Sequence, residues 1–188
     1  MEFKQDDIIM PASETKKDFR EALETVQKLV TGYDPFKGHR PEDAASGKST
    51  FHKSGTSSEM LEWVFEKLDY MSYKKLEVNK ATIILVFKTD TEIGTAVTTT
   101  LDPESEYEID TPHGDYLQAK GPVVKHESET KNVTFVVTNE GDSENTAWCL
   151  ASVYPGLPDV PGDWSGLKAG DKVSGQELIN RGITRAHQ

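Results

Sequence analysis

Two blocks of β-branched and aliphatic residues constrain the fold more than any other feature of the sequence. Residues 81–87 read Ala-Thr-Ile-Ile-Leu-Val-Phe, and residues 133–138 read Val-Thr-Phe-Val-Val-Thr. Such runs are typical of strands at the centre of a sheet, where the side chains on both faces are buried. We therefore expect the two blocks to be neighbouring antiparallel strands of one sheet.

Each block is followed by turn residues and a second extended segment, which predicts two hairpins. The first hairpin joins residues 81–87 to the Thr- and Val-rich residues 95–101. The second joins residues 133–138 to residues 146–154. A further short strand is expected near residues 116–119, so the sheet has four to five strands.

Helical periodicity marks the segments that precede these strands. Apolar residues recur at three- and four-residue steps over residues 13–30, which predicts an amphipathic helix that Gly32 ends. A second helix begins at the capping box that runs from Thr56 to Glu59, and it extends to about Tyr70. The predicted fold class is therefore α+β, with N-terminal helices packed on a mainly antiparallel sheet of four to five strands.

The length of 188 residues is within the range of one domain, so we expect residues 1–188 to form a single domain. Residues 32–55 are rich in Gly, Lys and His, which predicts a flexible segment of which little is buried. Residues 157–188 form a short C-terminal extension. A second capping box at Ser174 predicts a short helix within it.

Charge and cysteine content exclude several classes of protein. The formal net charge of −11 disfavours non-specific binding to nucleic acid and to anionic lipid, and it favours cationic partners. Cys149 is the only cysteine and lies in an apolar run, so we expect a buried, inert thiol and no intramolecular disulfide. No leader and no apolar run of about 20 residues is present, which predicts a cytoplasmic protein without a membrane span.

No pattern in the sequence predicts a metal or a cofactor. The five histidines lack the i, i+4 spacing of a helical metal site, and they have no thiolate partners. The tripeptide Gly47-Lys48-Ser49 lacks the upstream glycine and the preceding strand of a phosphate-binding loop. We therefore expect neither a metal nor a cofactor.

The order of the predicted helix and strands is similar to that of one known superfamily. The segment from Phe51 to Gly55 contains His52 and opens onto a helix, four predicted strands follow, and a late strand ends in Ser152-Val153-Tyr154-Pro155. This arrangement resembles the barnase/EndoU/colicin/RelE-like superfamily of small metal-independent ribonucleases, many of which are toxins. Several members end a late strand in a Thr-Ala-Tyr-Pro-like sequence, from which this chain departs by Ser for Thr and by Val for Ala.

The resemblance implies cleavage of RNA by general acid–base catalysis. This reaction needs a base for the 2′-hydroxyl, an acid for the leaving 5′-oxygen, and donors for the charge that develops on phosphorus. The candidates are polar residues of the loops and strands after residue 50. The catalytic candidates are His52, Lys120, His113 and Ser152, and the substrate-binding candidates are Lys53, Lys125, His126, Thr134 and Tyr154.

Two other functions stay open. The net charge and the acidic residues 102–110 are also typical of a non-enzymatic interaction or immunity-type protein that covers a basic partner. A small-molecule site beside residues 32–55 is a third alternative. RNA is the expected partner in the first case and a basic protein in the second.

Overall fold

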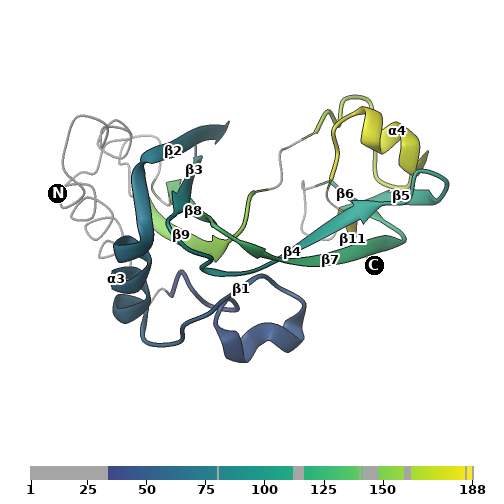
Figure 1. The fold of residues 1–188 in the computed structure, drawn as a ribbon. Helices are drawn as coiled ribbons and strands as arrows, with labels where there is room; N and C mark the ends of the chain where they lie inside the picture. Colours follow the sequence, from purple (N-terminus) through teal and green to yellow (C-terminus); the bar gives the residue numbers. More distant parts are fainter. Residues whose placement is uncertain are drawn as a thin grey trace. The chain divides into compact units, whose positions relative to one another are not determined.

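The structure is a computed structural model that describes residues 34–79, 81–111, 117–139, 141, 148–158, 162–184 and 186–187. The helix predicted over residues 13–30 lies outside these residues. The chain divides into two compact units, Met1–Ala96 with Ser128–Pro158 and Val97–Glu127 with Asp159–Gln188 (Figure 1). The two units are described in turn, and the single-domain organisation stays a prediction.

The first unit is built on a four-stranded antiparallel sheet with the order β2-β3-β8-β9. In this sheet Ile83 lies opposite Val137, and Val86 lies opposite Thr134. The prediction that the two aliphatic blocks pair as antiparallel neighbours is therefore confirmed. The strands are β2 (Leu68–Asn79), β3 (Thr82–Thr89), β8 (Asn132–Asn139) and β9 (Trp148–Pro155).

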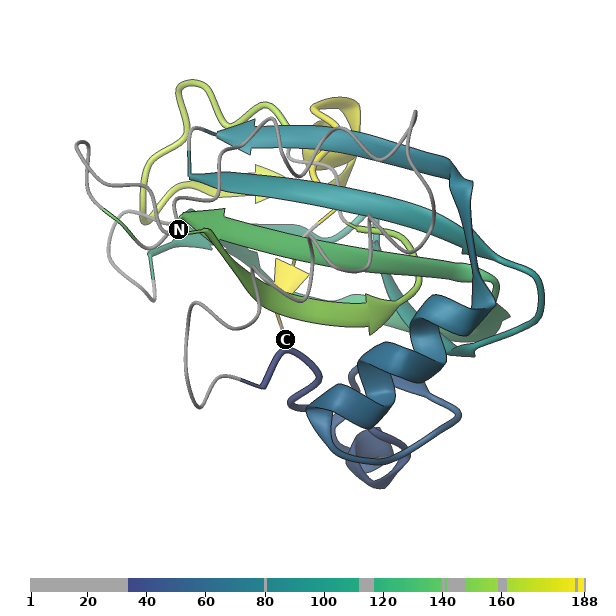
Figure 2. The ribbon, with the colours of Figure 1, turned by 90° about the vertical axis from the view of Figure 1, so that its left-hand side faces the viewer.

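Helix α3 (Ser57–Lys67) shares one apolar core with this sheet and continues directly into β2 (Figure 2). It begins at the predicted capping box: Thr56 Oγ1 accepts from Glu59 N at 3.2 Å, and Glu59 Oε1 accepts from Thr56 N at 3.2 Å. Its apolar stripe packs on the sheet, and the rings of Phe65 and Phe135 lie 6.3 Å apart.

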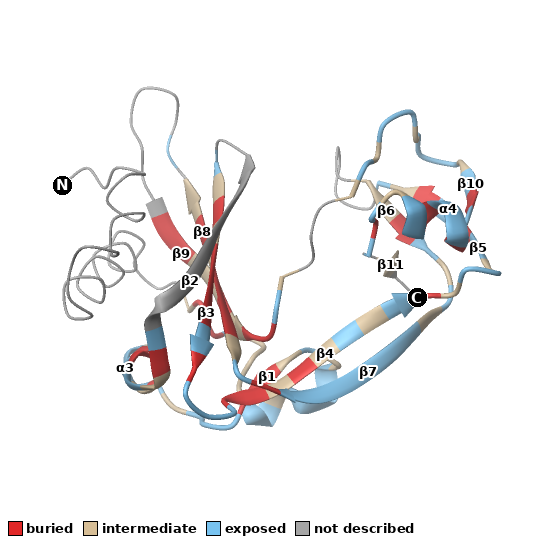
Figure 3. Ribbon diagram, turned by 45° about the horizontal axis from the view of Figure 1, so that its top comes forward, coloured by how far each residue is buried: buried red, intermediate tan, exposed pale blue. Residues whose placement is uncertain are grey.

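A second, three-stranded sheet has the order β1-β4-β7 and contains β1 (Thr50–Phe51), β4 (Gly94–Leu101) and β7 (Val123–Thr130). The short 3-10 helix η1 (Pro41–Ser46) precedes β1. β7 is an edge strand whose residues 124–129 are all exposed, and Figure 3 shows most of it in the colour of exposed residues. The chain passes from the first unit to the second through β4 and returns through β7.

The second unit contains a four-stranded sheet with the order β10-β5-β6-β11. Its core includes Tyr107, Ile109 and Leu178. Gly175 is required at its position, because an added Cβ would lie 1.9 Å from the carbonyl oxygen of Asp102. The elements are β5 (Glu106–Asp110), β6 (Gln118–Lys120), β10 (Lys172–Ser174), α4 (Gly175–Asn180) and β11 (Ala186–His187).

The predicted fold class is wrong. The described residues form eleven strands in three sheets and only three short helices, so this part of the chain is mostly β and not a set of N-terminal helices packed on one sheet. Two of the missed strands, β2 and β7, carry polar and apolar residues without strict alternation. A strand exposed on both faces, such as β7, needs no alternation and therefore gives no signal of period two.

The first predicted hairpin is also wrong, whereas the second is confirmed. β8 pairs with β9 as expected, but β3 pairs with β2 and β8, and β4 pairs with β1 and β7. The cause lies in the expected turn, where Ile93 is fully buried in the core and its N–H donates to Thr130 O at 2.9 Å. The chain therefore enters a new sheet at this point.

The C-terminal helix and the cysteine agree with expectation. Ser174 caps α4 by accepting from Glu177 N at 3.2 Å, and Gly182 follows the helix with a φ of +72°. Cys149 is buried, with 1% of its surface exposed. The short strand expected near residues 116–119 corresponds in part to β6.

Candidate functional site

Residues 34–55, here named the 34–55 segment, pack against the first unit. Phe36 and Phe51 are buried in its core, and their rings meet edge to face at 5.8 Å. The N–H of Val153 donates to Pro35 O at 2.8 Å, so the segment begins along the outer edge of β9. Only Pro35, Phe36, Thr50 and Phe51 of the 22 residues are buried, so the expectation that little of this segment is buried holds for most of it, whereas its flexibility stays a prediction.

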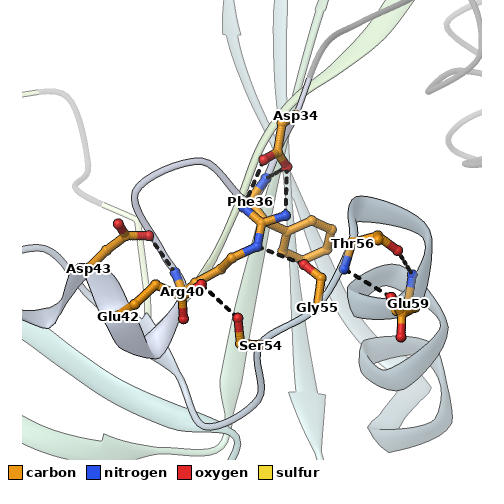
Figure 4. A network of polar contacts seen from close by, with 9 residues as sticks. All are labelled: Asp34, Phe36, Arg40, Glu42, Asp43, Ser54, Gly55, Thr56 and Glu59. Carbon is orange, nitrogen blue, oxygen red and sulfur yellow. Dashed lines mark hydrogen bonds and ion pairs between the residues drawn. The ribbon is translucent and has the colours of Figure 1, made fainter.

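Arg40 joins the two ends of the 34–55 segment (Figure 4). Its guanidinium donates to both carboxylate oxygens of Asp34, at 2.7 and 3.3 Å, and its Nε donates to Gly55 O at 2.8 Å. The hydrogen bonds with Asp34 raise the pKa of Arg40. A bidentate pair fixes the geometry of both partners, so Arg40 holds the segment as a closed loop.

The first candidate site is a histidine–carboxylate pair. His52 directly follows β1, and its Nε2 lies 2.5 Å from Glu129 Oε2 on β7. Thr95 on β4 donates from its hydroxyl to the other oxygen, Glu129 Oε1, at 3.2 Å. The three residues therefore lie across the three neighbouring strands of one sheet. Both side chains of the pair are close to half exposed, so solvent and a ligand reach them.

The second candidate site is His39, which lies beside Tyr154 of β9 with ring centroids 5.6 Å apart. His39 Nδ1 lies 2.7 Å from the carbonyl oxygen of Ser49, which only accepts, so Nδ1 carries the hydrogen and neutral His39 has its lone pair on Nε2. Burial lowers the pKa of His39, and the charge of Lys48 lowers it further, against the hydrogen bond with Ser49. The imidazole is therefore held neutral near pH 7.

The carboxylates around these sites are held by hydroxyl groups. Ser54 donates to Glu42 Oε1 at 2.7 Å, and this bond lowers the pKa of Glu42. The amide and hydroxyl of Thr56 lower the pKa of Glu59 in the same way. Both groups are therefore acceptors at neutral pH.

Three of the predicted site residues lie on β8 and β9 of the first unit. Thr134 is fully buried, and its hydroxyl donates to Gly156 O at 2.8 Å. Tyr154 lies opposite Thr134, and Ser152 lies opposite Val136. The bond to Gly156 occupies the Thr134 hydroxyl within the protein, so this residue is positioned for stability and not for contact with phosphate.

The structure brings only some of the predicted residues together. Lys120, Lys125 and His126 belong to the second unit, and Lys120 lies opposite Glu108. His126 Nε2 is 3.4 Å from Thr100 Oγ1. His113 lies outside the described residues. Within the first unit, Lys53 is exposed and adjacent to His52 in the chain.

Sequence reasoning missed Glu129, Thr95 and His39 as parts of these sites. Glu129 is 77 positions from His52, and only the pairing of β4 with β1 and β7 makes them neighbours. No spacing rule reports such a contact. One feature of the sequence could have indicated His39 as a site residue: it lies between Gly38 and Arg40 in a segment whose composition differs from that of its surroundings.

The acidic stretch at residues 102–110 is largely occupied by structure. Asp102 accepts from Glu104 N at 2.9 Å and from the Ser105 hydroxyl at 2.7 Å. Glu108 pairs with Lys172 at 3.1 Å. Glu104 and Glu106 are exposed, as is Glu108 beside its lysine partner.

The described residues contain no group of three or more His, Cys, Asp or Glu side chains placed to hold a metal ion. In the same part of the chain, no helix has the length and apolar character needed to cross a membrane. Comparisons with protein-family models, with curated proteins and with solved structures gave no match for this chain. Any statement of function therefore rests on the side chains themselves.

Proposed function

We propose that this protein is a metal-independent, RNA-cleaving domain in which His52 transfers a proton and Glu129 orients its imidazole. The single observation that carries the proposal is the contact of His52 Nε2 with Glu129 Oε2 at 2.5 Å on an exposed sheet surface. A carboxylate that is itself held by a hydroxyl fixes the ring, which is the relation of proton donor and orienting group that acid–base catalysis uses.

The chemistry needs two proton-transfer groups. A base removes the 2′-hydroxyl proton, the 2′-oxygen attacks phosphorus, and an acid protonates the 5′-oxygen as its bond to phosphorus breaks, which leaves a 2′,3′-cyclic phosphate. His39 is suited to the base, because its neutral ring has the lone pair on Nε2. His52 is suited to the acid, because Glu129 contacts its Nε2 and orients the ring.

Local charge supports an anionic substrate in spite of the net charge of −11. Lys53 follows His52 directly in the chain, and Lys48 lies close enough to His39 for its charge to lower the pKa of that histidine. Because exposed charges more than about 8 Å away are screened at physiological salt, the local potential is set by these lysines together with Glu129 beside His52 and Asp43 near His39. The remaining acidic field is expected to slow association and to make activity sensitive to ionic strength.

The experiment is incubation of the purified chain with transfer RNA and with total RNA in excess EDTA. We expect cleavage that leaves 2′,3′-cyclic phosphate ends, and a loss of about 100-fold or more in His52→Gln, since general acid–base catalysis contributes about 10²–10⁴-fold. Glu129→Gln is expected to lower the rate to a smaller extent, because it acts through His52. The matched control is Glu127→Gln, which removes another exposed carboxylate of β7 and leaves the rate unchanged.

Two results would refute the proposal. One is the absence of cleavage by the wild-type protein at any salt concentration. The other is equal cleavage by wild type and His52→Gln, which would assign the activity to a contaminant or to another site.

A second candidate function is binding of a basic protein. It is favoured by the net charge of −11 and by the exposed Glu104 and Glu106 at the start of β5. It predicts association with a cationic partner that is lost at high salt and weakened in Glu104→Gln/Glu106→Gln. Retention of no partner at low ionic strength would reject it.

A further inference from the structure

The second unit has a pocket of about 270 Å³ that the proposed RNA chemistry does not use. It lies between the end of β4 and the residues that follow α4. All of its described lining residues belong to the second unit, so the site does not depend on the first. They are Thr99, Thr100, Leu101, Ile179, Gly182, Ile183 and Thr184.

The end of helix α4 forms one wall of this pocket. The N–H of Gly182 donates to Ile179 O at 2.9 Å, and the N–H of Ile183 donates to Leu178 O at 2.9 Å, so the chain turns sharply after the helix. Gly182 makes the turn with a φ of +72°, and a Cβ built on it would meet no atom within 4 Å. The turn therefore opens onto free space and not onto packed side chains.

The lining is apolar at its base and carries hydroxyl groups around it. Leu101 and Ile183 are members of the buried core, with 8% and 2% of their surface exposed. Ile179 is one of the few large apolar side chains with substantial exposure, at 42%. None of the described lining residues carries a charge. A charged ligand would lose hydration here without a compensating partner, whereas a neutral one would not.

The volume limits the size of the ligand. A cavity of about 150 Å³ accepts benzene, so about 270 Å³ accepts a ring system of roughly ten non-hydrogen atoms. The Thr100 hydroxyl already donates to Val124 O at 3.4 Å, but threonine hydroxyls both donate and accept, so Thr99 and Thr184 offer a partner for a single polar group on such a ring. We propose that this pocket binds a small, neutral, largely apolar ring compound with one hydrogen-bonding group.

The experiment uses the full chain labelled with ¹⁵N and indole as the probe, because indole is a neutral bicyclic ring with one N–H donor. We expect saturable shifts of the backbone amides of Leu101, Gly182, Ile183 and Thr184, with a dissociation constant of about 1 mM or lower. Indole-3-acetate carries the same ring with a carboxylate, and we expect it to bind at least tenfold more weakly.

Two variants test the position of the site. Ile179→Phe and Thr184→Phe each enlarge an exposed lining side chain, so each is expected to fill the pocket and abolish the shifts while the fold is retained. Gln176→Phe makes a comparable change on the exposed surface of α4 outside the described lining, and we expect it to bind indole as the wild type does. The proposal is overturned by the absence of saturable shifts up to about 10 mM indole, by equal binding of indole-3-acetate, or by unchanged binding in both filling variants.

Discussion

Replacing Phe36 by alanine tests whether the 34–55 segment is part of the folded core. The side chain has no exposed surface, it meets Phe51 edge to face at 5.8 Å, and it belongs to the same apolar cluster as α3 and the central sheet. The sequence predicts a flexible segment at this place. Removal of this ring lowers the free energy of unfolding much more if the segment is packed than if it is flexible.

The magnitude follows from the burial. Removing a fully buried phenylalanine ring costs about 3–5 kcal/mol in free energy of unfolding, because apolar contacts are lost and a cavity remains. With a urea dependence of about 2 kcal/mol per molar, the unfolding midpoint is expected to fall by about 2 M. For a side chain of a mobile surface loop the expected change is within about 0.5 kcal/mol.

Trp63 reports the unfolding of this region, because its ring lies 6.0 Å from that of Phe51. The measurement is urea unfolding followed by tryptophan fluorescence in a background in which Trp148 and Trp164 are phenylalanine. Lys37→Ala, at the exposed neighbouring position, is the control and is expected to leave the midpoint unchanged. A loss below about 1 kcal/mol in Phe36→Ala would show that the segment is not packed as described.

Two further predictions concern residues of the first unit. Thr134→Val keeps the shape of the side chain but leaves Gly156 O without its donor. We therefore expect the free energy of unfolding in urea to fall by about 1–3 kcal/mol, with no direct effect on RNA binding. Reduced RNA binding at unchanged stability would contradict this role. His39→Asn retains a donor for Ser49 O but does not titrate. Burial lowers the pKa of His39 below 6.5 in the folded state, so the wild type loses stability as pH falls from about 6.5 through the folded pKa. The variant is expected to lose less stability over that interval. Identical urea midpoints of wild type and variant at every pH would refute this.

The two central strands of the four-stranded sheet, β3 and β8, were predictable because most of their residues are buried or partly buried. The blocks that contain Ile83 and Val137 are largely apolar, and β8 pairs with β9, the next strand along the chain. The capping box at Thr56 and the N-cap at Ser174 were equally local, and both mark the starts of helices. Features that depend on residues close together in the chain, or on the burial of one whole strand, can be predicted from the amino-acid sequence.

The sites depended on contacts that no local pattern reports. Gly94 shows why, since a Cβ there would lie 2.5 Å from Thr50 O and 2.9 Å from the Pro155 ring. The glycine is visible in the sequence, but the two segments that approach it are not. The same long-range pairing of β4 with β1 and β7 brings Glu129 to His52, and the sequence therefore indicated His52 without its partner.

The position of β8 in the chain has a consequence for synthesis on the ribosome. β2 and β3 are consecutive in the chain and pair with each other, but β3 gains its other neighbour, β8, only after residues 97–127 of the second unit have been synthesised. During that interval the aliphatic edge of β3 has unpaired backbone groups, and such edges pair with strands of other nascent chains. The nascent chain is therefore most exposed to such pairing until β8 has emerged from the ribosome and occupied that edge.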